Sequence, residues 1–358
     1  MKTDPASFTR NSRTLLKKYF GFFLSLAIAA ILLQFTTVVD SIIVGQFLGP
    51  TAMAGVRVAT PIVNILSILA TFLAIGATSA TSIAFGKRDP QKASYIFTLT
   101  LFVGIIVGVL FAVIVAPLAT PIANAISSDP TTIEYAATYI RIVASSGPAL
   151  ILSSVIPMMI RIDGKTKLSM AVLITGGLGN VAFDLLFMGV FKMGVDGSAI
   201  ATDVGLVAAV LVGCLYFLYK KRMLRIVNVL KKGQPLKSSA KVISKSGLPG
   251  ALRTIFLVIS NLIINLVIGK QVGAIGIALW TVFSNVQLLG SAFFSSVGQA
   301  LMPINGVLYG EKDYGGLRSM FKVAFYLLGI LIVILVAIVE IIPAQIIGIF
   351  NIVDSDGR

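Results

Sequence analysis

Three aspartates of this sequence lie inside long apolar runs. Asp40 lies in the run 19–47, and Asp184 and Asp203 lie in two later runs. A carboxylate in the hydrocarbon core of a bilayer costs about 3 kcal/mol or more, so it faces protein or water and commonly marks a route for an ion or substrate. The pattern therefore predicts a transport function.

The three aspartates are expected at a similar depth. Because a helix rises about 1.5 Å per residue, Asp40, Asp184 and the pair Thr202 and Asp203 each lie roughly 8 to 11 Å below the same membrane surface. Asn180 precedes Asp184 by one turn and shares its helix face. Three helices are thus expected to bring these polar side chains into one layer.

Such a layer has a defined chemistry. Carboxylates gathered in a medium of low dielectric constant cannot all stay ionised unaided, and a bound proton or metal cation relieves both the repulsion and the desolvation. All the candidate ligand atoms are oxygens, which suits a hard cation rather than zinc or copper. Sodium and proton both remain open as the bound ion.

Structural roles are the alternative for the same residues. Asn180 and Asp184 can instead form hydrogen bonds that hold helices together. Thr202 and Asp203 point about 100° apart on their helix, which leaves open whether both face the layer. The small residues of TGGLGN, 175–180, are expected to allow close helix contact rather than to bind phosphate.

The composition indicates an all-α polytopic membrane protein. Of 358 residues, 57% are apolar and 12% are charged, and the mean hydropathy is +0.97. The absence of histidine and the presence of a single cysteine, Cys214, argue against disulfide frameworks, zinc sites and histidine-based catalysis. We expect a protein that is not an enzyme and that needs no cofactor other than a coupling ion.

Nine apolar runs are long enough to cross about 30 Å of hydrocarbon as helices. They are residues 19–47, 53–84, 92–116, 133–160, 168–190, 197–219, 247–269, 274–308 and 317–342. The breaks between them contain Gly, Pro and Asp, which favour turns. Within the fourth run, Pro148 is a candidate kink residue.

The distribution of Lys and Arg predicts the orientation. The amino-terminal segment and alternate breaks carry 23 of the 29 basic residues, and basic loops stay in the cytoplasm during membrane insertion. This pattern places the amino terminus in the cytoplasm and accounts for the net charge of +15 without nucleic acid. We divide the chain into a cytoplasmic segment 1–18, a six-helix lobe 19–219, a basic linker 220–246 that lies on anionic lipid, and an incomplete second lobe 247–358.

The second lobe is expected to repeat the first. A shift of 224 residues places Gly86 on Gly310 and Asp89 on Asp313. Because the first lobe has an even number of helices, the two lobes would insert in the same orientation, as parallel repeats. The second lobe contains three of the six expected helices, so we expect a chain truncated at its carboxyl end.

The cation site is expected in the first lobe alone, because isoleucine occupies position 264, the counterpart of Asp40. Uncharged polar or amphipathic side chains are candidates for the wall of a substrate cavity, with interhelical contacts as the alternative role. They are Gln34, Asn261, Asn265, Trp280, Asn285 and Gln287.

Four segments resemble the multidrug and toxic compound extrusion (MATE) transporters. They are VDSIIVGQFLGPTAMAG (39–55), RIDGKTK (161–167), GNVAFDLLFMG (179–189) and GVDGSAIATDVG (194–205). The resemblance spans nearly the whole chain, about nine of the family's twelve helices, and is nearest to the archaeal and bacterial branch.

This resemblance implies two lobes of six transmembrane helices around a central cavity, and antiport in which inward Na⁺ or H⁺ drives the export of amphipathic, often cationic, compounds. The family's cation site would consist of Asp40, Asn180, Asp184 and Thr202, with Tyr139 matching a cavity tyrosine and Asp203 as a possible additional member. Ala27 departs from the family, because many relatives have a proline there that bends the first helix. The protein is expected to be a monomer in the plasma or inner membrane, in contact with lipids and without a nucleic-acid partner.

Two other functions are compatible with the sequence. A lipid-linked oligosaccharide flippase of the same superfamily would carry Arg and Lys in its central cavity, and this chain has almost none in the middle of its helices. A truncated membrane protein that transports nothing is the second alternative.

Overall fold

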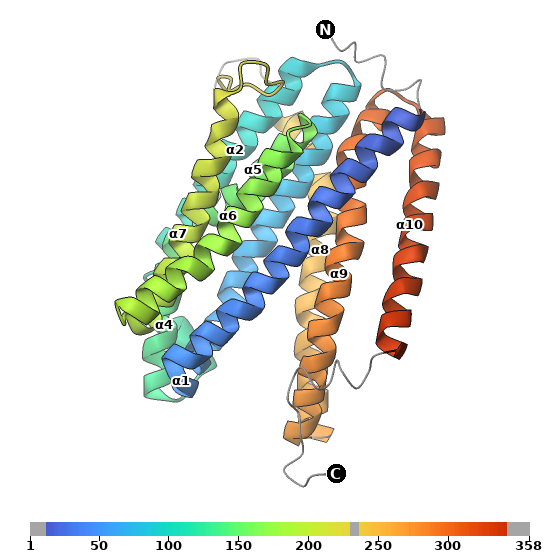
Figure 1. Cartoon of the computed structure of the whole chain (residues 1–358). Coiled ribbons are helices and arrows are strands. Elements are labelled where there is room, and N and C mark those ends of the chain that lie inside the picture. The colour runs from blue at the N-terminus through green and yellow to red at the C-terminus, as the bar shows by residue number, and fades with distance from the viewer. Residues whose placement is uncertain (1–11, 230–235, 272, 342–358) are drawn as a thin grey trace.

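The computed structural model describes residues 12–229, 236–271 and 273–341, and over these residues the chain is built from helices and short connections without strands (Figure 1). The helices are α1 (Ser12–Gly86), α2 (Pro90–Val115), α3 (Ala119–Ile126), α4 (Pro130–Ser145), α5 (Gly147–Ile162), α6 (Thr166–Asp184), α7 (Gly194–Cys214), α8 (Leu236–Gln271), α9 (Gly273–Gly310) and α10 (Tyr314–Ile341). A π-helix, Leu185–Val190, continues α6, and a 3₁₀-helix, Leu215–Leu218, continues α7. A helix satisfies its own backbone hydrogen bonds, which is what a chain in hydrocarbon requires.

The membrane-spanning helices agree with the sequence pattern. Seven described segments are long and apolar enough to cross a membrane, and the bent pair α4 and α5 forms an eighth. The remaining predicted run, 274–308, corresponds to α9. The predicted all-α membrane fold is therefore confirmed.

Several helix boundaries differ from the predicted runs. The first helix begins at Ser12, so the predicted segment 1–18 is partly helical. The run 133–160 is broken at Ser146, where α4 and α5 meet at 51°. This break lies just before Pro148, which has no N–H to continue the helix of α4. The short amphipathic α3 was missed because eight residues give little periodicity.

The long helix α1 consists of two consecutive helical segments. They meet at Gly49, where φ is 73°, in the left-handed region that glycine enters without steric cost. The predicted break Gly49-Pro50 is thus confirmed. No other residue of α1 leaves helical geometry, so the helix passes through Ala27 without a kink.

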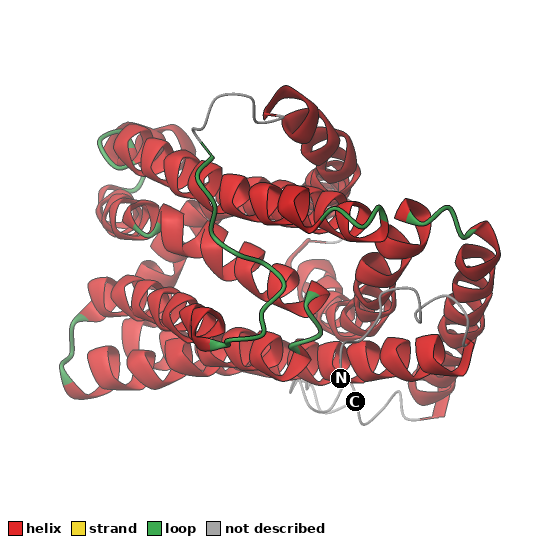
Figure 2. Ribbon diagram, turned by 90° about the horizontal axis from the view of Figure 1, so that it is seen from above, coloured by secondary structure: helices red, strands yellow, loops and turns green. Residues whose placement is uncertain are grey.

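The helices form two groups that meet along α1. Helices α1 to α7 gather on one side, and α8 and α9 pack against α1, with α10 against α9 (Figures 1 and 2). The start of α1 belongs to the second group's core, where Tyr19 and Leu26 pack with Val297 and Met320.

One end of the bundle carries the basic connections, and we call it the basic end (top of Figure 1). The turns α1–α2, α5–α6 and α9–α10 lie there, together with residues 219–229 that follow the 3₁₀-helix. The break in the middle of α1 lies at the opposite end.

Two turns at the basic end are copies of one another. Arg88 and Lys312, 224 residues apart, are non-glycine residues with φ of 57° and 61°. One residue later, the Asp89 carboxylate accepts the Lys92 N–H at 2.9 Å, and in the copy the Asp313 carboxylate accepts the Gly316 N–H at 2.8 Å. The repeat predicted from sequence is thus present in the backbone and its caps.

The two repeats touch through small residues at the basic end. A Cβ on Gly86 would lie 2.1 Å from the Val307 oxygen, and one on Gly310 would lie 2.4 Å from the Ile83 oxygen. A Cβ on Gly306 would lie 2.3 Å from the Ser82 Cβ. These close approaches are possible only because glycine has no side chain. We call Gly86, Gly306 and Gly310 the glycine seam.

The predicted linker 220–246 is only partly a separate segment. Leu224 is fully buried against the first group, and the Arg225 and Val227 N–H groups donate to Ser94 Oγ and Thr98 Oγ1 at 3.2 and 3.1 Å. From Leu236 onward the chain is already α8. Residues 223–227 therefore pack along α2, which the interpretation as a lipid-surface segment did not anticipate.

Candidate cation site

Four helices of the first group bring the predicted polar residues together, toward the end opposite the basic end. Asp40 lies on α1 two to three turns before Gly49, and Asp184 is the last residue of α6. Thr202 lies on α7 and Tyr139 on α4. The π-helix that starts after Asp184 is a rare form that occurs mostly at functional positions.

Asp184 is the most buried carboxyl of this group. Its side chain has no exposed surface, and neither carboxylate oxygen accepts a hydrogen bond from a described donor. The carboxyl of Asp40 lies close enough to share a hydrogen bond with it. Two adjacent carboxyls of which one is fully buried require a shared proton or a cation between them.

Neutral oxygen atoms lie beside this pair. Asn180 Nδ2 donates to Thr202 Oγ1 at 3.2 Å, which leaves the Asn180 carbonyl oxygen free to accept or ligate. Thr202 Oγ1 donates to the Ser198 carbonyl at 3.1 Å. Tyr139 lies near Thr202 and within electrostatic range of Asp40 and Asp184.

Glycines explain how these helices come so close. A Cβ on Gly177 would lie 2.8 Å from Thr36 Oγ1 of α1, and one on Gly205 would lie 2.9 Å from the Asn180 nitrogen. The TGGLGN segment thus packs α6 against α1 and α7. This is the helix-contact role that the sequence predicted.

Asp203 lies beside this group but faces another partner. Its carboxyl lies near Ser146, at the α4–α5 bend, and its Oδ1 is buried without a hydrogen-bond partner. The sequence left open whether Asp203 and Thr202 face the same site, and in the structure they contact different side chains.

The predicted cavity residues do not form one group in the described part of the chain. Gln34 Nε2 donates to the Leu288 carbonyl at 3.4 Å and so joins α1 to α9. Asn261 Nδ2 donates to Leu257 within its own helix at 2.9 Å, and the Trp280 ring packs 5.1 Å from that of Phe283. Gln287 is exposed. The side chains of Asn265 and Asn285 lie outside the described residues.

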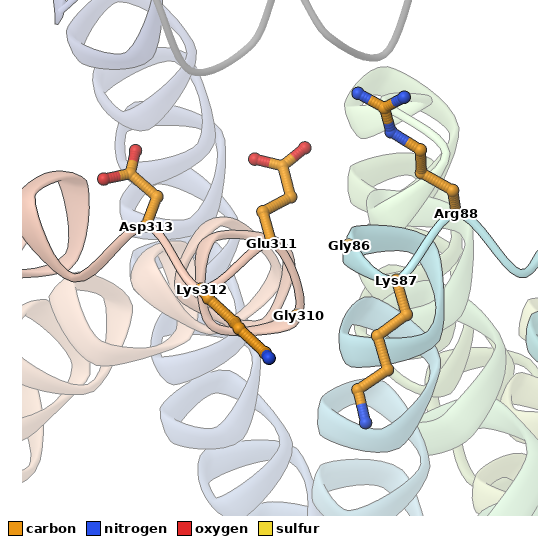
Figure 3. A pocket seen from close by; sticks show the side chains of 7 residues that line it. All are labelled: Gly86, Lys87, Arg88, Gly310, Glu311, Lys312 and Asp313. Atoms are coloured by element: carbon orange, nitrogen blue, oxygen red, sulfur yellow. The ribbon is translucent and has the colours of Figure 1, made fainter.

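A pocket of about 620 Å³ lies at the basic end, between the two repeated turns (Figure 3). It is lined by Gly86, Lys87, Arg88, Gly310, Glu311, Lys312 and Asp313. The sequence aligns these two turns but does not predict that they face each other. The signal was present, since repeats related by an axis along the membrane normal bring equivalent turns together around that axis.

Glu311 is the least compensated group of this pocket. Its Oε2 is buried without a hydrogen-bond partner. Burial raises the pKa of Glu311 above its ordinary value, the positive charge of Arg88 opposes that rise, and the negative charge of Asp313 adds to it.

The sequence matches a family model over most of its length. The family is described as MatE, and the matched residues are 25–186 and 249–353. The multidrug export protein MepA of Staphylococcus saprophyticus is 22% identical to this chain over 306 residues. That alignment covers 85% of this chain and 67% of the relative, so the chain spans about two thirds of the relative's length.

Solved transporter structures share the fold. A MOP superfamily transporter from Pyrococcus furiosus, described as having a binding pocket of reverse polarity, superposes with a TM-score of 0.90 at 22% identity, over 99% of this chain and 78% of its own. A multidrug resistance MATE family transporter, described as outward-facing, has a TM-score of 0.90 at 22% identity, over 98% of this chain and 77% of its own. At this identity the likeness establishes the architecture.

Proposed function

Because this chain belongs to the MatE family, we propose that it is a cation-coupled antiporter that exports amphipathic, cationic compounds. The observation that carries the proposal is the Asp40–Asp184 pair, in which a fully buried carboxyl without a hydrogen-bond donor adjoins a second carboxyl. Sodium or proton is the coupling ion, since either one neutralises the pair.

The neighbouring oxygens support this role. A sodium ion would take the two carboxylates together with the free carbonyl oxygen of Asn180 and the hydroxyl of Thr202, a set of hard oxygen ligands. A proton would instead be shared between the carboxyls. In both cases the ion cancels the negative charge of the carboxyl pair, and its departure restores a site that attracts the next cation.

The direction of transport follows from the charge distribution. The basic end is proposed to lie in the cytoplasm, which places Asp40 and Asp184 nearer the external surface of the cell membrane. An ion entering from outside would reach the pair first, while the exported compound would enter from the basic end.

Transport in vesicles tests the proposal. The purified protein is inserted into liposomes, and the liposomes are loaded with a fluorescent cationic dye. Dye movement is then followed under an imposed sodium or proton gradient. We expect gradient-dependent transport that falls by at least about tenfold in Asp40→Asn and Asp184→Asn, since each removes a charge that acts in the coupling step.

Asp196→Asn is the matched control, because Asp196 is an exposed aspartate in the first turn of α7. It should transport at the wild-type rate. Dye movement that ignores both gradients, or that survives both site substitutions, would reject the proposal.

A further inference from the structure

An arginine of the second group lies deep inside the bundle. Arg253 is on α8, and its Nη2 donates to Ser295 Oγ of α9 at 3.3 Å. Ser295 precedes Gly310, at the basic end, by fifteen residues, so the contact lies about 22 Å along α9 from that end. A charged side chain this far inside a membrane protein is costly and commonly marks a binding site.

The helices around Arg253 supply no nearby carboxylate to neutralise it. Helix α8 packs mainly on α1 and α9. Neither α8 nor α9 contains Asp or Glu, and Asp40 is the only acidic residue of α1. Within the described part of the chain, Arg253 has the neutral Ser295 hydroxyl as its hydrogen-bond partner, which uses one of the five N–H donors of a guanidinium. The guanidinium therefore keeps both its charge and further donors for an anion.

The contact lies on the face of α9 that is turned toward the first group. Ser295 precedes Gly306 by eleven residues, which is three helical turns, so the two share one face of α9. Gly306 contacts α1 at the glycine seam. Two turns beyond Ser295 in the other direction, the Leu288 carbonyl accepts from Gln34 of α1. Arg253 therefore binds Ser295 between two contacts of α9 with α1, at the interface of the two groups and away from lipid.

The candidate cation site is too distant to be the counter-ion of Arg253. Leu288 precedes Ser295 by seven residues, and Asp40 follows Gln34 by six, and both steps lead away from the basic end. At 1.5 Å per residue these steps separate Arg253 from Asp40 by roughly 15 to 20 Å along the bundle. A salt bridge requires an N–O distance of about 4 Å, so the two charges form separate positions.

We propose that Arg253 and Ser295 bind the carboxylate of an exported compound. A guanidinium presents parallel N–H donors that match the two oxygens of a carboxylate, and substrates of transporters built from repeats bind at the interface of the repeats. The proposal rests on the proposed function and narrows its substrate class. The exported compounds include amphipathic zwitterions, which carry a carboxylate in addition to their cationic group.

Binding of two related dyes to the purified protein tests this site. One dye is a zwitterionic rhodamine with a free carboxylate, and the other is its methyl ester, which keeps the cationic rings but carries no anion. Fluorescence polarisation in neutral detergent measures the Kd of each dye without a cation gradient. We expect wild type to bind the free acid about tenfold more tightly than the ester. Arg253→Gln should bind both dyes with the affinity of the ester.

Further variants separate carboxylate binding from effects on folding. Arg253→Lys keeps the charge but loses the parallel donors, so its preference for the free acid should lie between those of wild type and Arg253→Gln. Ser295→Ala should weaken binding of the free acid by about twofold, because the guanidinium loses one contact that orients it. Arg318→Gln is the control at an exposed arginine of α10 and should match wild type. The affinity for the ester should be the same in all variants.

A wild-type protein that binds the free acid no more tightly than the ester would overturn the proposal, as would an Arg253→Gln protein in which both dyes bind equally more weakly. Loss of the preference on adding phosphatidylglycerol would assign Arg253 to a lipid phosphate and overturn it as well. A protein that distinguishes the two dyes but moves neither under a sodium or proton gradient would instead reject the proposed function, so the two failures are distinguishable.

Discussion

The first-group cation site and the glycine seam differ in how they use the repeat. At the seam, the two turns share their backbone angles, caps and glycines. At the cation site the repeat is broken, because Ile264 replaces the counterpart of Asp40. The shared features serve contact between the two groups, and the proposed cation chemistry lies where one repeat departs from the other.

The largest effect is expected at the candidate cation site, which the two repeats do not share. Asp40→Asn should abolish gradient-driven transport, and adding Ile264→Asp to it should not restore transport. The reason is that residue 264 lies on α8 of the second group, whereas Asp184 ends α6 of the first group, so the new carboxyl does not rebuild a pair with Asp184. The dye assay measures both variants. Restored transport in the double variant would show that the second group can host the site.

The next prediction concerns the glycine seam, which the two repeats share. Gly310→Ala should lower the free energy of unfolding by about 1 to 3 kcal/mol, because its Cβ would press on the Ile83 carbonyl and overpacking of this kind destabilises. Thermal unfolding in detergent measures the change.

Gly298→Ala is its matched control on the same helix. A Cβ there meets nothing within 4 Å, so this substitution should be neutral or stabilise by up to about 1 kcal/mol. Equal effects of Gly310→Ala and Gly298→Ala on the free energy of unfolding would show that the close contact at the glycine seam does not require glycine.

A smaller effect is expected from the neutral part of the cation site. Asn180→Ala removes the hydrogen bond to Thr202 and should cost about 0.5 to 1.5 kcal/mol of stability. A double-mutant cycle with Thr202→Val isolates the pairwise contribution. A coupling free energy near zero would show that the contact does not organise the site.

The smallest effect concerns the pocket between the repeated turns. Burial raises the pKa of Glu311, so the folded protein favours its protonated form. Stability linked to this group is therefore full below its ordinary pKa and is lost as pH rises through the raised value. Glu311→Gln, which stays neutral, should unfold at a slightly higher temperature than wild type near neutral pH and at the same temperature near about pH 4.

Glu134→Gln, at an exposed position of α4, is the control and should show no such pH-dependent difference. A Glu311→Gln protein that is less stable at neutral pH would mean that attraction to Arg88 outweighs burial.

The helices and the polar layer were predictable because membrane helices are set by local apolar runs and a fixed rise per residue. Asp40 and Asp184 were placed in one layer by depth alone, and the structure puts them side by side. The repeated turns followed from aligned glycines and aspartates.

Features that depend on contacts between distant segments were not predictable. The basic residues around Leu224 indicate a surface segment, whereas its few apolar side chains and backbone bonds to α2 determine its burial. The nearness of Asp203 to Ser146 depends on how α7 crosses the bend, and no local pattern encodes that crossing.

Cation binding to the purified chain tests the central claim most directly. Sodium titrations at several pH values, with bound sodium and released protons counted per chain, measure occupancy without transport. The account predicts saturable uptake of sodium, or titration of a shared proton, that is lost in Asp40→Asn and Asp184→Asn and kept in Asp196→Asn. Binding that is unchanged in Asp40→Asn and Asp184→Asn would contradict it.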